Sequence, residues 1–223
     1  ATDAEADIWL TAISTSIHRP TKPMILALKP LLTGPSSRKA YLTVSSLINN
    51  FCTLNEGCDS DGDIQTIIRT FTEQLRYNCR QESSDDHENV LMALKALGNT
   101  GHAQSAVPTL QRCAANTELP MELRVAALQS FRRMACLADT TELFNLLSNI
   151  ENDAELRIHA YLVLMTCPNS VTLDRVLRLL EAEEVNQVGS FIWTHLTNLQ
   201  ETSNPHKQQN QSHLGKRTTE EDI

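Results

Sequence analysis

Apolar residues recur at a fixed step of 33 positions through the second half of this chain. One set consists of Met92, Val125, Ile158 and Phe191, and a second consists of Leu94, Ala127, Ala160 and Trp193. The segments between them keep the same step, in the sets Leu110, Leu143, Val176 and Ala114, Leu147, Leu180. A period of this length accommodates two short helices and two turns, and one such pair has too little core to fold alone. The repeat therefore predicts an α-solenoid, a two-layered and curved arc of stacked helix pairs.

Helical spacing of apolar residues extends over most of the chain, and no segment alternates convincingly between apolar and polar residues over five positions. We expect helices over 3–18, 23–33, 37–51, 61–80, 85–98, 103–115, 120–135, 140–149, 153–165, 171–182 and 186–200. Pro120, Asp139 and Asp153 stand at expected helix starts, where a proline is tolerated and a short carboxylate can accept from free backbone N–H groups. These signals predict an all-α fold.

The organisation of the chain follows from where the repeat is visible. We expect one helical arc over residues 1–203, with clear repeats over 85–200. Residues 204–223 are polar and lack apolar periodicity, so we expect a disordered tail. This tail contains Asn210, in the only N-glycosylation sequon, which would be used if the chain is secreted. The chain begins without an initiator Met or a signal-peptide pattern, on a helix already under way, which suggests a segment of a longer polypeptide.

The charge and composition exclude several classes of protein. A formal net charge of −8 and a pI near 5.3 disfavour general nucleic-acid binding. Aromatic residues make up 4% of the chain, which is low for a β-sandwich or a base-stacking surface. No apolar run approaches the length of a transmembrane helix.

Motifs for catalysis or for a metal or cofactor site are not found in the sequence. Asp59, Asp61 and Asp63 alternate as in a calcium loop, but the glycine and glutamate of that motif are replaced by Ile64 and Thr70. An acidic helix start explains them better. His87 and Glu88 open like a zinc-protease motif whose second histidine is missing. We therefore expect no enzyme activity, no metal and no cofactor.

The cysteines bear on the cellular compartment. The six are Cys52, Cys58, Cys79, Cys113, Cys136 and Cys167. An even count suggests disulfides formed in an oxidising compartment, while six buried thiols in a cytosolic helical protein remain the alternative. The 15 pairings that six cysteines allow are not distinguished by sequence alone.

Three segments go beyond a generic helical repeat: residues 89–101, 123–134 and 188–196. In this order and spacing they resemble the helical domain of the large lipid transfer proteins, which include vitellogenin, apolipophorin, apolipoprotein B and the microsomal triglyceride transfer protein. Residues 160–165, followed by Cys167 and Pro168, are most similar to the apolipophorins. The resemblance covers about residues 1–207 and is specific in the second half, whereas residues 208–223 do not follow the family.

This resemblance implies a lipovitellin-like helical domain and a role in lipid transport. In the family the arc braces two β-sheets whose apolar faces hold phospholipid, diacylglycerol or other neutral lipid, and the proteins are secreted into hemolymph or plasma. The implied partners are lipid through the parent protein, the β-sheet domains of that parent and a lipoprotein receptor. The implied location is extracellular.

The resemblance also implies a pairing of the cysteines. Cys79 and Cys113 match a bridge between neighbouring helices in apolipoprotein B. Cys52 and Cys58 are close enough in sequence for a local bridge, and the remaining Cys136 and Cys167 would then form the third pair.

Two functional interpretations follow from different classes of protein. The first interpretation is a segment of a lipid carrier. It predicts that the isolated chain exposes an apolar face on which the sheets of the parent protein would dock, and that this face includes some of Ile192, Trp193 and Leu196. In the alternative, a protein-interaction scaffold, the groove is polar and the thiols are free. A secreted clotting protein built on the same arc is not separated from the lipid carrier by this segment.

Overall fold

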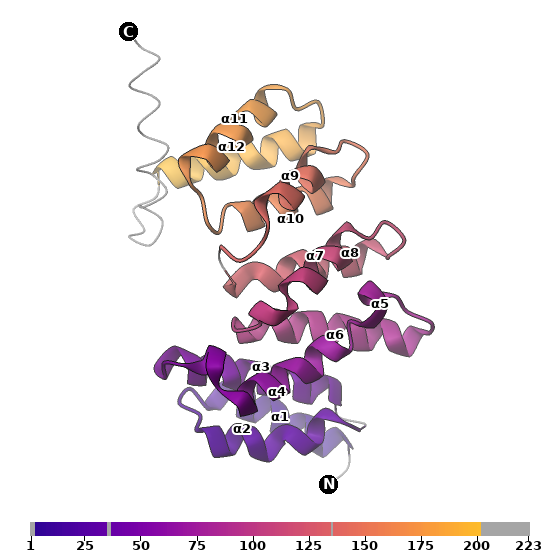
Figure 1. Ribbon diagram of the computed structural model, residues 1–223, viewed down its shortest axis with the longest axis vertical. Coiled ribbons are helices and arrows are strands. Elements are labelled where there is room, and N and C mark those ends of the chain that lie inside the picture. The colour runs from indigo at the N-terminus through magenta and orange to yellow at the C-terminus, as the bar shows by residue number, and fades with distance from the viewer. Residues whose placement is uncertain (1–2, 35–36, 135, 202–223) are drawn as a thin grey trace. The chain divides into compact units, whose positions relative to one another are not determined.

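The computed structural model describes residues 3–34, 37–134 and 136–201, and their regular structure is entirely helical (Figure 1). This confirms the all-α prediction for the described chain. The contacts divide the protein into two compact units, residues 1–138 and 139–223.

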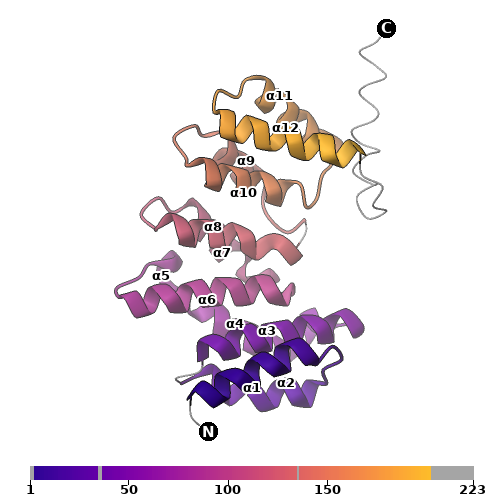
Figure 2. The ribbon, with the colours of Figure 1, turned by 180° about the vertical axis from the view of Figure 1, so that it is seen from behind.

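The first unit contains eight α-helices among its described residues. They are α1 (Asp3–Ser16), α2 (Lys22–Leu28), α3 (Ser37–Leu54), α4 (Gly62–Glu73), α5 (Arg76–Cys79), α6 (Ser84–Thr100), α7 (Val107–Ala115) and α8 (Met121–Gln129). Four short 3₁₀ turns join or extend them: η1 (Lys29–Leu32), η2 (Cys58–Ser60), η3 (Gln104–Ala106) and η4 (Ser130–Arg133). Helix α1 packs on α3, α3 on α6 and α6 on α8, so these four form one layer (Figure 2). Three further helices pack against this layer: α2 contacts α3, α4 contacts α6, and α7 contacts α8.

The second unit repeats this arrangement with two helix pairs. It contains α9 (Thr140–Ser148), α10 (Ala154–Leu164), α11 (Ser170–Glu181) and α12 (Asn186–Glu201). Helix α9 packs on α10 and α11 on α12, while α10 and α12 lie against each other. Two-layered stacking of helix pairs is therefore present within each unit, and the single curved arc over residues 1–203 stays a prediction.

Most positions of the 33-residue step lie in the core, but Trp193, the last member of the second set, is 65% exposed. Leu94, Ala127 and Ala160 are completely buried at equivalent positions of α6, α8 and α10. The intervening helices behave in the same way, with Leu110, Leu143 and Val176 all buried. The periodicity arises because each helix must bury the same stripe against its neighbours.

Polar side chains define several helix starts. Asp139 and Asp153 accept hydrogen bonds from the backbone N–H groups of Thr141 and Glu155, each at 2.8 Å. Both were expected as capping residues from the sequence. A cap of this kind satisfies backbone donors that have no partner inside the helix.

The continuous helix predicted over 61–80 is wrong. Helix α4 ends at Glu73, and Tyr77, Asn78 and Cys79 then adopt left-handed backbone angles, with φ of 54°, 56° and 64°. Such angles cost free energy for residues with a Cβ, so other contacts must hold them. These contacts come from α7 and the loop after it, as described below.

Gly98 permits the close packing of α6 on η4. A Cβ added at Gly98 would lie 2.9 Å from the Ser130 Cα atom. The Ser130 hydroxyl, which is completely buried, donates to the Leu94 carbonyl oxygen at 2.8 Å. Gly101 then ends α6 with a φ of +70°, a conformation that glycine adopts at little cost.

Candidate functional site

Two kinds of feature stand out as candidates for function: the cysteines that join helices, and the exposed face of α12. No group of three or more His, Cys, Asp or Glu side chains that could hold a metal ion occurs in the part of the chain that the structure describes.

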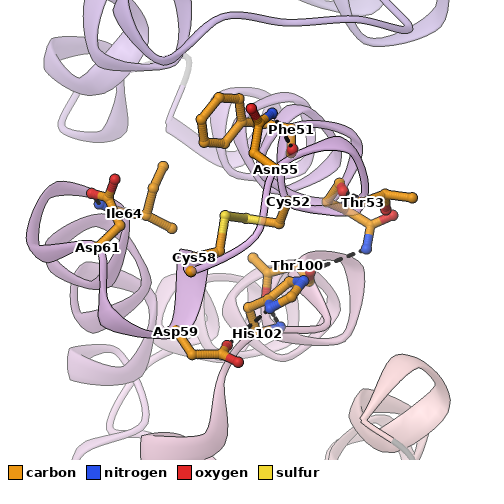
Figure 3. The surroundings of a disulfide bond; sticks show 12 residues. Phe51, Cys52, Thr53, Asn55, Cys58, Asp59, Asp61, Ile64, Thr100 and His102 are labelled. Atoms are coloured by element: carbon orange, nitrogen blue, oxygen red, sulfur yellow. Dashed lines mark hydrogen bonds and ion pairs between the residues drawn. A yellow bond between two sulfur atoms is a disulfide. The ribbon is translucent and has the colours of Figure 1, made fainter.

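The structure joins Cys52 to Cys58, with a Cα–Cα distance of 5.6 Å. Figure 3 shows this disulfide at the end of α3, with the loop that follows it. The Gln65 side chain donates to the carbonyl oxygens of Cys58 and His102, both at 3.3 Å. The disulfide and Gln65 together fix the loop between α3 and α4 and tie it to the segment after α6.

The aspartates near this disulfide serve as caps and ion-pair partners. Asp61 caps α4 by accepting from the backbone N–H groups of Asp63 and Ile64, and its carboxylate lies 2.9 Å from Lys22 Nζ. Asp63 lies 2.8 Å from the same ammonium group. The hydrogen bond from Lys22 holds the pKa of Asp61 below its ordinary value. These contacts account for the acidic residues as a helix start, in line with the sequence.

Asp59 makes the third acidic contact. His102 Nδ1 donates to Asp59 Oδ1 at 2.9 Å, across 43 positions of sequence (Figure 3). This hydrogen bond holds the pKa of Asp59 below its ordinary value of 3.8. The ionised Asp59 therefore stabilises the fold fully at pH values well above 3.8, its ordinary pKa in the unfolded chain. This stabilisation is lost as the pH falls through the lower pKa that Asp59 has in the folded state.

We expect Asp59→Asn to remove this acid sensitivity. Above about pH 5 the wild-type chain should be more stable than the variant by about 0.2–1 kcal/mol, because the Asp59 carboxylate is largely exposed and screened. The difference should shrink between about pH 4 and pH 2. Urea unfolding across this range measures it, with Glu56→Gln, an exposed carboxylate of the same loop, as the matched control. A difference that stays constant down to pH 2 would contradict the assignment.

The structure also joins Cys79 to Cys113, with a Cα–Cα distance of 5.6 Å. Both residues are completely buried. Arg112 Nε donates to Asn78 Oδ1 at 2.9 Å, and the Asn116 amide donates to the Asn78 carbonyl oxygen at 3.5 Å. The disulfide and these bonds hold the left-handed turn against the end of α7.

Cys136 and Cys167 belong to the first and the second unit, respectively. Cys136 has a left-handed φ of 66°. No cysteine among the described residues is a free thiol. The pairing of Cys136 with Cys167 stays a prediction.

Helix α12 carries the three residues from which the docking surface was expected. Ile192 is completely buried and Leu196 is 5% exposed, whereas Trp193 is 65% exposed. Ile192 and Leu196 are therefore core residues, because α12 turns their side of the helix towards its neighbours in the second unit. Of the three expected docking residues, only Trp193 has a largely exposed side chain, and its docking stays a prediction.

The side chains that α12 itself exposes around Trp193 are uncharged. Between residues 186 and 200, α12 contains no Asp, Glu, Lys or Arg. Phe191 is 36% exposed, and Ser190 and Thr194 are also exposed. Aromatic residues are enriched in protein interfaces, which makes this face of α12 a candidate docking surface.

Two polar contacts in the second unit were not anticipated from the sequence. Tyr161, which is completely buried, hydrogen-bonds through its hydroxyl group to His195 Nδ1 at 2.7 Å, and burial raises the pKa of Tyr161. Arg157 forms a buried ion pair with Glu183. The repeated Glu-Leu-Arg sequences at 122–124 and 155–157 are a signal that could have identified the arginine.

The other predicted features concern the tail and the membrane. Asn210 and residues 204–223 lie outside the described residues. Within the described residues, the helices include none that is long and apolar enough to cross a membrane.

The chain is similar in sequence to one protein family and to several named proteins. A family model described as the vitellogenin TPR domain matches residues 1–197. Apolipophorins of Locusta migratoria are 28% identical over 94% of this chain, and apolipophorins of Drosophila melanogaster are 31% identical over 79%. Apolipoprotein B-100 of Rattus norvegicus is 26% identical over 73% of this chain. The chain spans only 6%, 5% and 4% of the lengths of these relatives, respectively.

Proposed function

Because this chain belongs to the vitellogenin TPR-domain family, the helical domain of the large lipid transfer proteins, we propose that it is a non-enzymatic segment of an extracellular lipid carrier. Its role is to brace a lipid cavity formed by sheets elsewhere in the parent protein. The family match over residues 1–197 carries this proposal. The names of the relatives, apolipophorins and apolipoprotein B-100, support lipid as the cargo.

The disulfides support an extracellular location. Cys52–Cys58 and Cys79–Cys113 are both bonded, and such bonds persist in oxidising compartments. A cytosolic interaction scaffold would keep these thiols reduced. We therefore favour the lipid carrier over the scaffold.

The brace acts through shape and rigidity. Stacked helix pairs bury their apolar stripes against each other, and the side chains that α12 exposes around Trp193 carry no charge. In the proposed parent, Trp193 docks on an apolar sheet, and the sheets, rather than this segment, determine which lipid is bound. A lipoprotein receptor is a further proposed partner, for which no residue is assigned.

Photocrosslinking in the lipid-loaded parent protein tests this docking. Benzoylphenylalanine at position 193 should crosslink to a peptide from a predicted β-strand, because Trp193 is 65% exposed on α12. The matched control is position 171, where Val171 of α11 is 66% exposed. We expect no sheet crosslink from position 171.

Two further measurements complete the test. Trp193→Ala should change the stability of the isolated chain by less than about 0.5 kcal/mol, because the side chain is largely exposed. A parent protein that contains no extractable lipid would refute the carrier assignment. Crosslinks from both positions to the same sheet, or from neither, would refute the docking of Trp193 while leaving lipid transport intact.

A further inference from the structure

Two arginines occupy equivalent positions 33 residues apart and make the same buried contact. Arg124 is the fourth residue of α8 and Arg157 is the fourth residue of α10. Arg124 Nε donates to the Ala114 carbonyl oxygen at 3.0 Å, and Arg157 Nε donates to the Leu147 carbonyl oxygen at 2.7 Å. The two acceptors are also 33 residues apart, and each is the penultimate residue of its helix, α7 or α9.

The position of these acceptors explains the need for a cationic donor. The last carbonyl groups of a helix have no partner inside it and carry a partial negative charge. Ala114 and Leu147 are completely buried, so water cannot easily replace the missing partner. A buried carbonyl left without a partner would cost free energy. Each arginine removes that cost by reaching back from the following helix.

Arg157 makes a second contact that extends to the last helix pair. Its Nη1 atom lies 3.1 Å from Glu183 Oε1, and its Nη2 atom donates to Glu183 Oε2. The side chains of Arg157 and Glu183 are 1% and 2% exposed. Glu183 Oε1 also accepts from the backbone N–H of Val185 at 2.9 Å, directly before α12 begins.

We propose that Arg124 and Arg157 form a repeated clasp, in which each arginine caps the end of the preceding helix. Arg157 is in addition a positioning residue: through its ion pair with Glu183 it acts as a latch that holds the α11–α12 hairpin against α9 and α10. The guanidinium group of Arg157 contacts the end of α9 and the turn between α11 and α12 from its place on α10. It thereby fixes where α12 starts and which of its faces is buried. This inference is independent of lipid binding.

Hydrogen exchange of the full chain with its disulfides intact tests the latch. Arg157→Met leaves Glu183 buried without its partner, which destabilises a fold strongly. We expect peptides from residues 170–201 to exchange about a hundredfold faster or more, while peptides from residues 84–129 keep their wild-type rates. The matched controls are Arg178→Met and Glu184→Met, which remove exposed charges of the same hairpin and should leave all rates unchanged.

Two further variants test whether Arg157 acts through its ion pair with Glu183 or only by filling space in the core. In the double variant Arg157→Met, Glu183→Met, the loss of protection over 170–201 should be smaller than the combined loss of the single variants, since no unpaired charge remains. In Arg157→Lys, the charge can still meet Glu183, so protection over 170–201 should recover in part. In both variants, as in Arg157→Met, the last turn of α9 should exchange faster than in the wild type, because the hydrogen bond from Arg157 Nε to the Leu147 carbonyl oxygen is missing.

Three outcomes would overturn the proposal. They are additive effects of the two single substitutions, equal loss of protection in residues 84–129 and 170–201, and an Arg157→Lys variant that exchanges as fast as Arg157→Met. If Arg157→Met does not fold, Arg157→Lys and Glu183→Gln are compared with the same controls. Wild-type rates over 170–201 in both would then contradict the latch.

Discussion

A variant in which Cys79 and Cys113 are both replaced by alanine is expected to lose roughly 3–4 kcal/mol of stability. The bond closes a segment with a sequence separation of 34, and opening so long a loop increases the entropy of the unfolded chain. The folded state also loses a restraint on the left-handed residues Tyr77 and Asn78. Urea unfolding of the unreduced protein, followed by the helical circular dichroism signal, measures the loss.

The second disulfide provides the matched control for this experiment. Cys52 and Cys58 are separated by only 6 positions, so their replacement by alanine should cost about 2 kcal/mol in the same entropy model. If the short loop proved as costly as the long one, chain entropy would not explain the role of the Cys79–Cys113 bond.

Phe71→Ala is expected to destabilise the chain by about 3–5 kcal/mol. Phe71 is completely buried on α4, and its ring centroid lies 4.8 Å from that of Tyr41 on α3. Truncation removes the buried ring and leaves a cavity that its surroundings fill only in part. Thermal and urea unfolding measure the change.

An exposed aromatic residue of the same unit gives the control for Phe71. Trp9 on α1 is 68% exposed, so Trp9→Ala should alter the stability by less than about 0.5 kcal/mol. A loss below 1 kcal/mol for Phe71→Ala would show that the core around Tyr41 collapses into the space or is not well packed.

The repeat made much of the fold predictable. A step of 33 residues identifies the buried positions Leu94, Ala127 and Ala160 without any knowledge of tertiary contacts, but it does not foresee that Trp193, the next member of the set, is exposed. The capping roles of Asp139 and Asp153 were also predictable, since they depend on interactions within a few residues.

The break after α4 was not predictable in the same way. Apolar spacing continues from Phe71 to Leu75, so the pattern alone favours a longer helix. The left-handed turn that follows the helix is held by contacts with α7 and the loop after it, including the bond from Cys79 to Cys113 more than 30 positions away. Local propensity carries no information about such a partner.

The candidate docking surface illustrates a second limit. Ile192, Trp193 and Leu196 are all apolar, and the sequence does not say which side of α12 meets the rest of its unit. The structure buries Ile192 and Leu196 and exposes Trp193. The rotation of a helix about its own axis depends on neighbours such as α10, and therefore on tertiary contacts.

The locations of the tryptophans have a spectroscopic consequence. The chain contains two, Trp9 on α1 and Trp193 on α12, and both are largely exposed. Their fluorescence in the native protein therefore resembles that of indole in water and changes little when the core melts. Fluorescence is a poor indicator of unfolding here, but a shift to shorter wavelength would directly signal that one of these two helices has become covered.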